Sequence, residues 1–279
     1  MTSRGRGWLF AAAACLALAL AQPAAAKGSA SKRLRVVSFN TAMGVVVKLR
    51  SEQGLRALFE DEPALRRAQV LSLQEVCLND RRQLALYLSV IESMHGVQYH
   101  YADYASDKLG QTCDKGQAIV SSYPIVGAGT LKLVTVGAAR SALWADLAIE
   151  GPGYSRIRIY DVHLSNREKS NYVPVRRRAE QAEKLLEHAL AFMRQYPRVP
   201  VIVSGDFNTL GTLSEPAVHE PVVERFQEYF QASRPGYTST FLVPYQLDWI
   251  FYAGLTLAWS GTAPVRYSDH VPVVADFRL

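Results

Sequence analysis

Hydrophobic residues along this chain fall into short runs that end abruptly at polar residues. The apolar run that begins at Pro200 stops at Gly205-Asp206-Phe207-Asn208, and runs bounded in this way are typical of buried strands. Short apolar or alternating segments predict further strands over residues 34–40, 70–76, 117–121, 131–135, 142–148, 155–164, 247–251 and 270–277. We therefore expect a strand-rich protein in which several strands deliver a polar side chain to a sheet edge.

Helical patterns lie between these strands. The clearest covers residues 174–196, where apolar side chains recur at the spacing of one buried stripe. The polar and aromatic segment 98–115 predicts a long loop, and the arginines at 176–178 are interpreted as a solvated helix face. Strands and helices alternate without a linker, which predicts one domain with sheets buried between helices. Further helices are expected over residues 51–68, divided by Pro63, over 80–94 and in part of 215–230.

The N-terminus has a different pattern from the rest. Arg4 and Arg6 precede an apolar run, residues 8–21, which is followed by small residues up to Ala26. This run is shorter than the roughly 20 residues that a membrane-spanning helix needs, and its flanks are typical of a secretory signal peptide. We expect residues 1–26 to be removed and residues 27–279 to be exported, secreted or periplasmic, as a single domain. An uncleaved anchor is the alternative.

Charge and cysteine content change this picture only a little. Without residues 1–26 the chain keeps 29 of its 31 basic residues against 25 acidic ones. This mild bias would help to attract a phosphate-bearing substrate, although solvated surface charge is its commoner explanation. Cys77 and Cys113 then remain, and an oxidising compartment would allow them to form one bridge; free buried thiols are the alternative.

Polar residues at the predicted strand ends are the candidate functional groups. If those ends meet, several carboxylates share a small volume, which is costly unless a cation neutralises them. Oxygen ligands without a Cys/His cluster suit Mg²⁺, Mn²⁺ or Ca²⁺ better than a structural zinc. Gly, Asp and Asn are also ordinary turn residues, so a purely local role is the alternative at the end of the central run. The candidates are Asn40, Glu75, His163, Asp206, Asn208, Asp248, Asp269 and His270.

The order of these motifs resembles that of one family, the endonuclease/exonuclease/phosphatase superfamily with its pancreatic-deoxyribonuclease-like fold. The similarity covers residues 38–270, and the segment 116–125 is similar to a further strand of the family. It implies an α/β (α+β) four-layer sandwich of two packed mixed β-sheets flanked by helices, with a metal-dependent phosphoesterase site at one end. The motifs are Ser38-Phe39-Asn40, Leu73-Gln74-Glu75-Val76, Asp161-Val162-His163-Leu164, Gly205-Asp206-Phe207-Asn208, Leu247-Asp248-Trp249-Ile250 and Ser268-Asp269-His270.

A metal ion is the cofactor that the resemblance implies. Glu75 would bind it, with Asn40 close by, and Asp269 would be a second metal ligand or would orient water. Mg²⁺ is the expected ion, with Mn²⁺ or Ca²⁺ as alternatives.

The resemblance also implies catalytic roles. Asp206 would orient or deprotonate the attacking water, and Asn208 would hold that water or a phosphate oxygen. His270, oriented by Asp248, would contact the phosphate together with His163. These groups would stabilise the transition state or protonate the leaving oxygen.

The substrate is expected to be a phosphodiester, either nucleic acid or a phospholipid head group. The residues after Asn40 lack the Asn-Gly-x-Arg sequence of abasic-site endonucleases, and those after Asn208 lack the Tyr-Arg of inositol polyphosphate 5-phosphatases. Mild basicity favours a nuclease. The apolar segment 241–245 and nearby tyrosines would suit a sphingomyelinase-like enzyme, although core packing explains that segment equally well.

Two other kinds of protein are weighed against this one. A non-catalytic binding module of the same fold would be favoured by loss of a key residue, and Glu75, Asp206 and both histidines are present. A serine hydrolase is disfavoured because the Gly-x-Ser-x-Gly elbow is absent. Arg140 is interpreted as either a phosphate ligand or a structural arginine. We infer no protein partner and expect a monomer.

Overall fold

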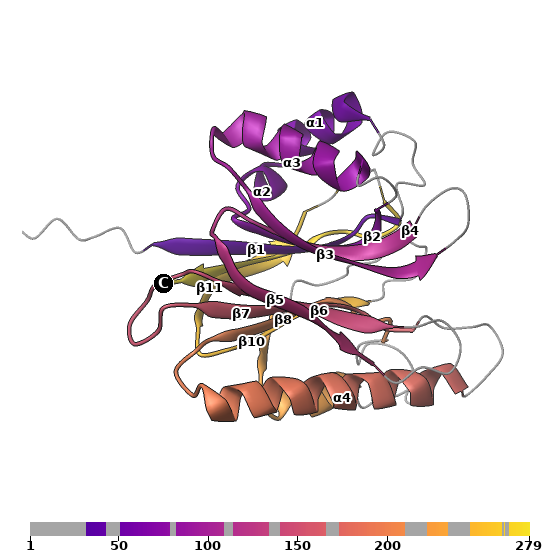
Figure 1. Cartoon of the computed structure of the whole chain (residues 1–279), viewed down its shortest axis with the longest axis vertical. Helices are drawn as coiled ribbons and strands as arrows, with labels where there is room; N and C mark the ends of the chain where they lie inside the picture. The colour runs from indigo at the N-terminus through magenta and orange to yellow at the C-terminus, as the bar shows by residue number, and fades with distance from the viewer. Residues whose placement is uncertain are drawn as a thin grey trace, which may run out of the picture. The chain divides into compact units, whose positions relative to one another are not determined.

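Two six-stranded mixed sheets pack face to face in the computed structural model of the chain (Figure 1). The structure describes residues 32–42, 51–78, 82–108, 114–133, 140–165, 173–209, 222–233, 246–263, 265 and 268–279. The first sheet has the strand order β11 (Thr256–Thr262), β12 (Val273–Arg278), β1 (Arg33–Asn40), β2 (Val70–Cys77), β4 (Asp114–Ser121) and β3 (His100–Lys108). The second has the order β5 (Ile125–Lys132), β6 (Ser141–Leu147), β7 (Ile157–His163), β8 (Val201–Asp206), β10 (Asp248–Ala253) and β9 (Gln231–Ala232).

Helices cover the outer face of each sheet. The first sheet packs against α1 (Glu52–Asp61), α2 (Pro63–Arg66) and α3 (Arg82–His95), and the second against α4 (Val173–Gln195) and α5 (Val222–Gln227). Figure 1 shows the resulting layers, with α1 to α3 on one side of the paired sheets and α4 on the other. A third apolar cluster fills the space between the sheets. The predicted α/β four-layer sandwich is confirmed.

The space between the sheets changes from apolar to polar along the strands. Alternate residues of each strand face inward, so that β1 contributes Val36 and then Ser38, and β8 contributes Ile202 and then Ser204. Ser204 donates a hydrogen bond across the sheets to the hydroxyl of Ser72 at 2.8 Å. The polar end of this interior leads directly to the strand ends that sequence patterning marks as functional.

Strand register brings those ends together. β1 and β2 are parallel with Asn40 beside Gln74, and β7 and β8 are parallel with His163 beside Asp206. Antiparallel β10 then sets Asp248 opposite Asp206. Residues far apart in the sequence are therefore neighbours at one end of the sandwich.

Three segments differ from their predicted structure. Residues 98–115 contain β3 and the start of β4, so the predicted loop is wrong; β3 is an edge strand, where polar residues tolerate exposure. The strand predicted over 131–135 is β5, whose half-exposed alternation and two glycines give a weak apolar signal. β11 and the short β9 have no counterpart among the predicted strands, and both lie at sheet edges.

The arginines at the start of α4 do not all form a solvated face. Arg176 is exposed and pairs with Glu180 at 2.9 Å, as that interpretation requires. Arg178, however, is fully buried, and its Nη1 donates to the carbonyl of Ser165 at 3.1 Å. The solvated-face interpretation is therefore wrong for Arg178, which ties α4 to the residues after β7.

The predicted signal peptide, residues 1–26, lies outside the described residues, so its removal stays a prediction. The described residues all belong to the compact unit Ser31–Leu279. Within the part of the chain that the structure describes, no helix combines the length and apolarity needed to cross a membrane.

Cys77 and Cys113 are expected to be bridged. Cys77 is half-buried at the end of β2, and Cys113 lies outside the described residues, so the bridge stays a prediction. It would close a loop of about 37 residues and contribute roughly 3–4 kcal/mol in the chain-entropy model. Thiol titration of denatured, unreduced protein comprising residues 27–279 should detect no free thiol. Two free thiols would exclude the bridge.

Candidate active site

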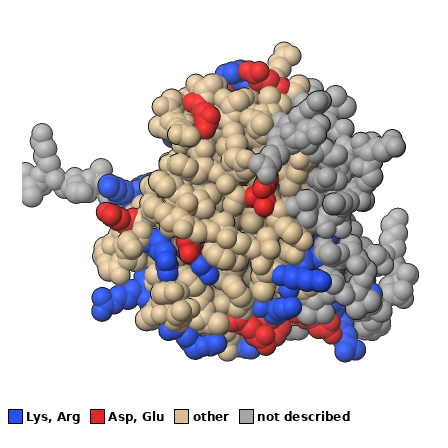
Figure 2. Space-filling view, in the orientation of Figure 1, with Lys and Arg blue, Asp and Glu red and all other residues tan. Residues whose placement is uncertain are grey.

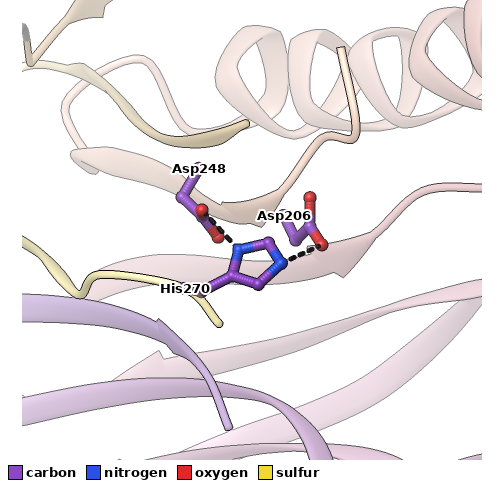
Figure 3. A group of neighbouring side chains, drawn as sticks. All are labelled: Asp206, Asp248 and His270. Carbon is purple, nitrogen blue, oxygen red and sulfur yellow. Dashed lines mark hydrogen bonds and ion pairs between the residues drawn. The ribbon is translucent and has the colours of Figure 1, made fainter. Parts of the chain in front are cut away.

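His270 lies between two carboxylates at the polar end of the sandwich (Figure 3). Its Nδ1 donates to Oδ2 of Asp248 at 2.7 Å, and its Nε2 lies 3.8 Å from Oδ2 of Asp206. Asp206 is the last residue of β8 and Asp248 the first of β10, so the strand register fixes their separation. A histidine oriented by one carboxylate and facing a second polar group is suited to acid–base chemistry.

Asp206 is held by two amide donors. Its Oδ1 accepts a hydrogen bond from the backbone N–H of Asn208 at 2.9 Å, and its Oδ2 accepts one from Nδ2 of Asn40 at 3.0 Å. The preceding Gly205 has φ +143°, and a Cβ there would lie 2.0 Å from the carbonyl oxygen of Val162. Glycine is therefore required for β8 to approach β7 this closely just before the carboxylate.

His163 joins the two halves of the site. Its Nε2 lies 3.5 Å from Oδ2 of Asp206, at the neighbouring strand end, and 3.7 Å from Oε1 of Glu75, on the other sheet. His163 is buried, whereas the Glu75 side chain keeps partial access to solvent. A group that binds at Glu75 would therefore meet an imidazole and the Asp206 carboxylate immediately behind it.

A bulge in β2 directs Glu75 into this site. The pairing of β2 with β4 shifts register between Gln74 and Val76, and Glu75 has φ +54°, in the left-handed region. Thr41 holds the bulge, because its hydroxyl donates to the Glu75 carbonyl at 2.9 Å and its N–H to the Gln74 carbonyl at 2.9 Å. Strained backbone of this kind clusters at functional sites, where the surrounding structure maintains it.

Ser268 anchors the segment that carries His270. Its hydroxyl donates to the carbonyl of Asn40 at 2.7 Å and accepts from the His270 N–H at 3.1 Å. Asp269, half-buried, has one carboxylate oxygen 3.4 Å from the same hydroxyl. The segment is thus fixed to the end of β1.

The environment of the site raises the pKa values of both Asp206 and His270. Burial raises the pKa of Asp206 and the charge of Asp248 adds to this, while the His270 imidazolium and the amide hydrogen bonds oppose it. Burial disfavours the charged form of His270, but the carboxylates of Asp248 and Asp206 outweigh it and raise the pKa of His270. His270 is therefore an imidazolium at neutral pH, beside a carboxylate with a raised proton affinity.

The oxygen-rich donor set fits a hard divalent cation. Among the described residues, the metal-ligating atoms that converge within 4.8 Å belong to the three side chains of Figure 3. His270 in that group already donates from Nδ1 to Asp248, which suits a hydrogen-bond donor better than a ligand. Glu75 and Asp269, predicted as ligands, are not part of this group. Glu75, partly exposed and next to two other polar groups, is the residue best placed to hold a hard ion.

The structure connects most of the predicted site residues by direct contacts. Asn208 contributes its backbone N–H, while its side-chain Nδ2 donates to the Leu164 carbonyl at 3.0 Å. Asp269 has one carboxylate oxygen near the Ser268 hydroxyl, and its charge contributes to the raised pKa of His270. The residues that form one continuous set are Asn40, Glu75, His163, Asp206, Asp248 and His270.

Sequence reasoning missed the buried polar layer beneath the site. Its members lie at inward-facing strand positions, where apolar residues are usual. Polar residues at these positions were the signal that the sequence offered. The layer consists of Ser72, Gln74, Gln117, Asp161 and Ser204, all buried.

Comparison with known proteins assigns the chain to a family. The sequence profile of the Endonuclease/Exonuclease/phosphatase family matches residues 37–270, so the chain belongs to that family, whose members are usually hydrolytic phosphoesterases and typically depend on a divalent metal. No curated protein matches the sequence significantly.

Solved structures share the fold at low sequence identity. An endonuclease/exonuclease/phosphatase from Beutenbergia cavernae is 20% identical, with a TM-score of 0.68, covering 88% of this chain and 72% of its own. The human Nocturnin catalytic domain with bound sulfate anion is 22% identical, with a TM-score of 0.66, and the match covers 88% of this chain and 93% of the Nocturnin chain. Truncated TDP2 from Caenorhabditis elegans is 17% identical, with a TM-score of 0.61, and the match covers 88% of this chain and 98% of the TDP2 chain.

Proposed function

We propose that this chain is an exported, divalent-metal-dependent phosphodiesterase that acts as a monomer on nucleic acid. The observation that carries the proposal is the contact series at the end of the sandwich, in which a buried carboxylate, two imidazoles and a partly exposed glutamate converge. Family membership supports the hydrolytic reaction. Export rests on the N-terminal pattern of residues 1–26.

The site residues meet the needs of phosphodiester hydrolysis. A phosphodiester is anionic and a poor electrophile, so its charge must be neutralised, water must be placed in line and the leaving oxygen must be stabilised. A divalent ion held by Glu75 would supply charge neutralisation. Asp206 would accept the proton of the attacking water. The imidazolium of His270, held by Asp248, would donate to a phosphate oxygen or to the leaving group.

Arg140 is a further candidate for contact with an anionic substrate. It directly precedes β6 at the end of the sheet that carries His163, and the register with β5 and β7 places it across from Leu133 and Leu164, on the α4 side of that sheet. Its side chain is buried, with 6% of the residue exposed, and neither Nε nor Nη1 has a hydrogen-bond partner among the described residues. A guanidinium is always charged, and burying it without an anion is costly. A substrate phosphate would satisfy it.

Replacing Arg140 by Met should therefore lower kcat/KM by roughly 10- to 100-fold, because a charged donor to the phosphate is lost. The melting temperature should stay the same or rise, since the variant no longer buries an unpaired charge. Steady-state kinetics and thermal unfolding on the same preparation measure both.

Arg158 provides the matched control. It is equally buried, at 8% exposed, but both its Nε and its Nη2 donate to the Asp146 carboxylate at 2.7 Å. Arg158→Met should lower stability by roughly 3–5 kcal/mol, because it leaves a buried carboxylate unpaired, and should leave kcat/KM of the folded protein nearly unchanged. A loss of stability without loss of turnover in Arg140→Met would reverse its assignment.

Metal removal should abolish activity. Hydrolysis of bis-p-nitrophenyl phosphate is expected to stop after exhaustive treatment with EDTA and to return on addition of Mg²⁺ or Mn²⁺, because no other group in the described site neutralises the phosphate fully. Full activity after chelation, with metal content verified by elemental analysis, would contradict metal dependence.

The substrate is tested by a parallel assay of plasmid DNA, RNA, sphingomyelin vesicles and phosphatidylinositol vesicles, with Asp206→Asn as the contamination control. Figure 2 shows basic and acidic side chains near one another towards the margins of the described part of one face. The small excess of basic over acidic residues in the sequence gives mild attraction to a polyanion. Nicking of DNA or cleavage of RNA is expected. Cleavage of lipid without either would instead identify a phospholipid phosphodiesterase.

A further inference from the structure

Asp161 is a buried acid that the proposed mechanism does not use. It lies on β7 two residues before His163, with Leu143 of β6 and Ser204 of β8 as its strand neighbours, and it is completely inaccessible to solvent. Its Oδ1 accepts a hydrogen bond from Nε2 of Gln74 at 2.5 Å. Because Gln74 belongs to β2, this bond crosses from one sheet to the other directly beneath the active site.

Two oxygen atoms of this pair have no hydrogen-bond partner in the part of the chain that the structure describes. Oδ2 of Asp161 and Oε1 of Gln74 are both buried, and neither receives a donor. An ionised Asp161 would leave both as unpaired acceptors, which is an expensive arrangement in a protein interior. A proton on the acid supplies the missing donor, and the Gln74 oxygen is an acceptor in the same pair.

The described residues that lie directly beside the pair are uncharged. The inward-facing residues next to Asp161 on β1, β2, β4 and β6 are Ser38, Ser72, Gln117 and Leu143, none of them ionisable in this range. The titratable groups at the strand ends above it are His163 on its own strand, Glu75 on β2, Asp206 on β8, and Asp248 with its partner His270. Burial, opposed chiefly by the hydrogen bond from Gln74, raises the pKa of Asp161 well above its ordinary value.

We propose that Asp161 is a neutral carboxylic acid that acts through Gln74 as a positioning residue for the active site. Gln74 directly precedes the left-handed residue Glu75, and its carbonyl is held by Thr41, so fixing its side chain fixes the bulge. Asp161 holds the Gln74 side chain from β7, the strand that carries His163. The pair thereby sets the 3.7 Å separation between Glu75 and His163, two groups on different sheets. The effect on turnover rests on the proposed function, whereas the protonation state does not.

The protonation state is tested without any assay of activity. The infrared difference spectrum between wild type and Asp161→Asn at neutral pH should contain the C=O stretch of one protonated carboxylic acid, shifting in D₂O. Surface carboxylates are ionised at this pH and cancel in the difference. A difference spectrum with carboxylate bands alone would overturn the proposal, whatever the enzyme hydrolyses.

The positioning role is tested by exchanging the partners. Asp161→Asn keeps one donor and one acceptor towards Gln74, so kcat/KM should stay within a few-fold of wild type. Asp161→Leu removes both and should lower kcat by roughly 10- to 100-fold while raising the Mg²⁺ concentration needed for half-maximal activity. Gln74→Glu places two acids together and should also lower kcat, and the double variant Gln74→Glu/Asp161→Asn, which restores an acid–amide pair in reverse, should recover it.

The exchange separates positioning from bulk packing. If Asp161→Leu does not fold, Asp161→Asn and the Gln74 variants still decide the outcome. Loss of kcat in Asp161→Asn equal to that in Gln74→Glu, or no recovery in the double variant, would overturn the positioning role. Inactivity of the wild-type protein on every phosphodiester would contradict the proposed function and leave the infrared result intact.

Discussion

Replacing Asp206 by Asn is expected to lower kcat/KM at least ~10²-fold, the scale on which loss of a positioned base acts. Asp206 is buried and held by the Asn208 N–H and the Asn40 amide, so the substitution removes the proton acceptor with little displacement of its neighbours. The melting temperature should fall little or rise, because the change relieves crowding with Asp248. Single-turnover kinetics at saturating Mg²⁺ measure the effect on the chemical step.

Asp276 is the matched control for Asp206→Asn. It is another buried aspartate at a strand position, but both of its carboxylate oxygens accept from the Arg35 guanidinium at 2.6 Å. It lies within β12 opposite Arg35, away from the strand ends that carry the site. Asp276→Asn should reduce stability and leave kcat/KM of the folded protein nearly unchanged. Near-wild-type turnover in Asp206→Asn, or an equal loss in both variants, would remove Asp206 from the mechanism.

Substitution of His270 by Ala should also lower kcat/KM at least ~10²-fold. In the described site, the His270 imidazolium is the one cationic side chain between Asp206 and Asp248. Its loss leaves these two buried carboxylates without a cation between them. Stability should fall as well, in contrast to Asp206→Asn, since a buried ion pair is broken. Kinetics combined with thermal unfolding distinguish these opposite effects.

Asp248→Asn is the graded companion to His270→Ala. It keeps the imidazole but removes the carboxylate that contributes most to raising its pKa. A group with a raised pKa stays protonated to higher pH, so the alkaline limb of kcat/KM in the wild type lies above the ordinary titration range of histidine. In Asp248→Asn this limb should move to lower pH. An unchanged pH profile would mean that His270 does not act as the acid.

The strands and the outline of the site were predictable from local pattern, whereas the four-layer arrangement was implied by the family resemblance. Apolar runs that end in Asn40, Glu75, His163 and Asp206 identify both the buried strands and the edge at which they terminate. The two parallel pairs then bring these ends together through backbone geometry alone, without any special side-chain contact. Periodicity could therefore indicate the site before any coordinates were known.

The remaining features depend on pairings that sequence does not display. The bulge that turns Glu75 inward exists only in the register between β2 and β4, and the Gln74–Asp161 contact only in the packing of one sheet on the other. β3 and β11 escaped prediction because edge strands with half-exposed faces do not require an apolar pattern. Arg178 could not be distinguished by sequence from the two arginines before it, since burial of one arginine in a row of three is decided by tertiary packing.

The place of β12 in the first sheet constrains how the molecule can be made. β12 lies between β1 and β11, and Arg33 pairs with Arg278, so the middle of that sheet joins the earliest and the latest strands of the chain. When all the strands before β12 have been synthesised, one hydrogen-bonding edge of β1 is still open. The first sheet is thus incomplete, with an open strand edge to which chaperones can bind, until residues 273–278 have been synthesised.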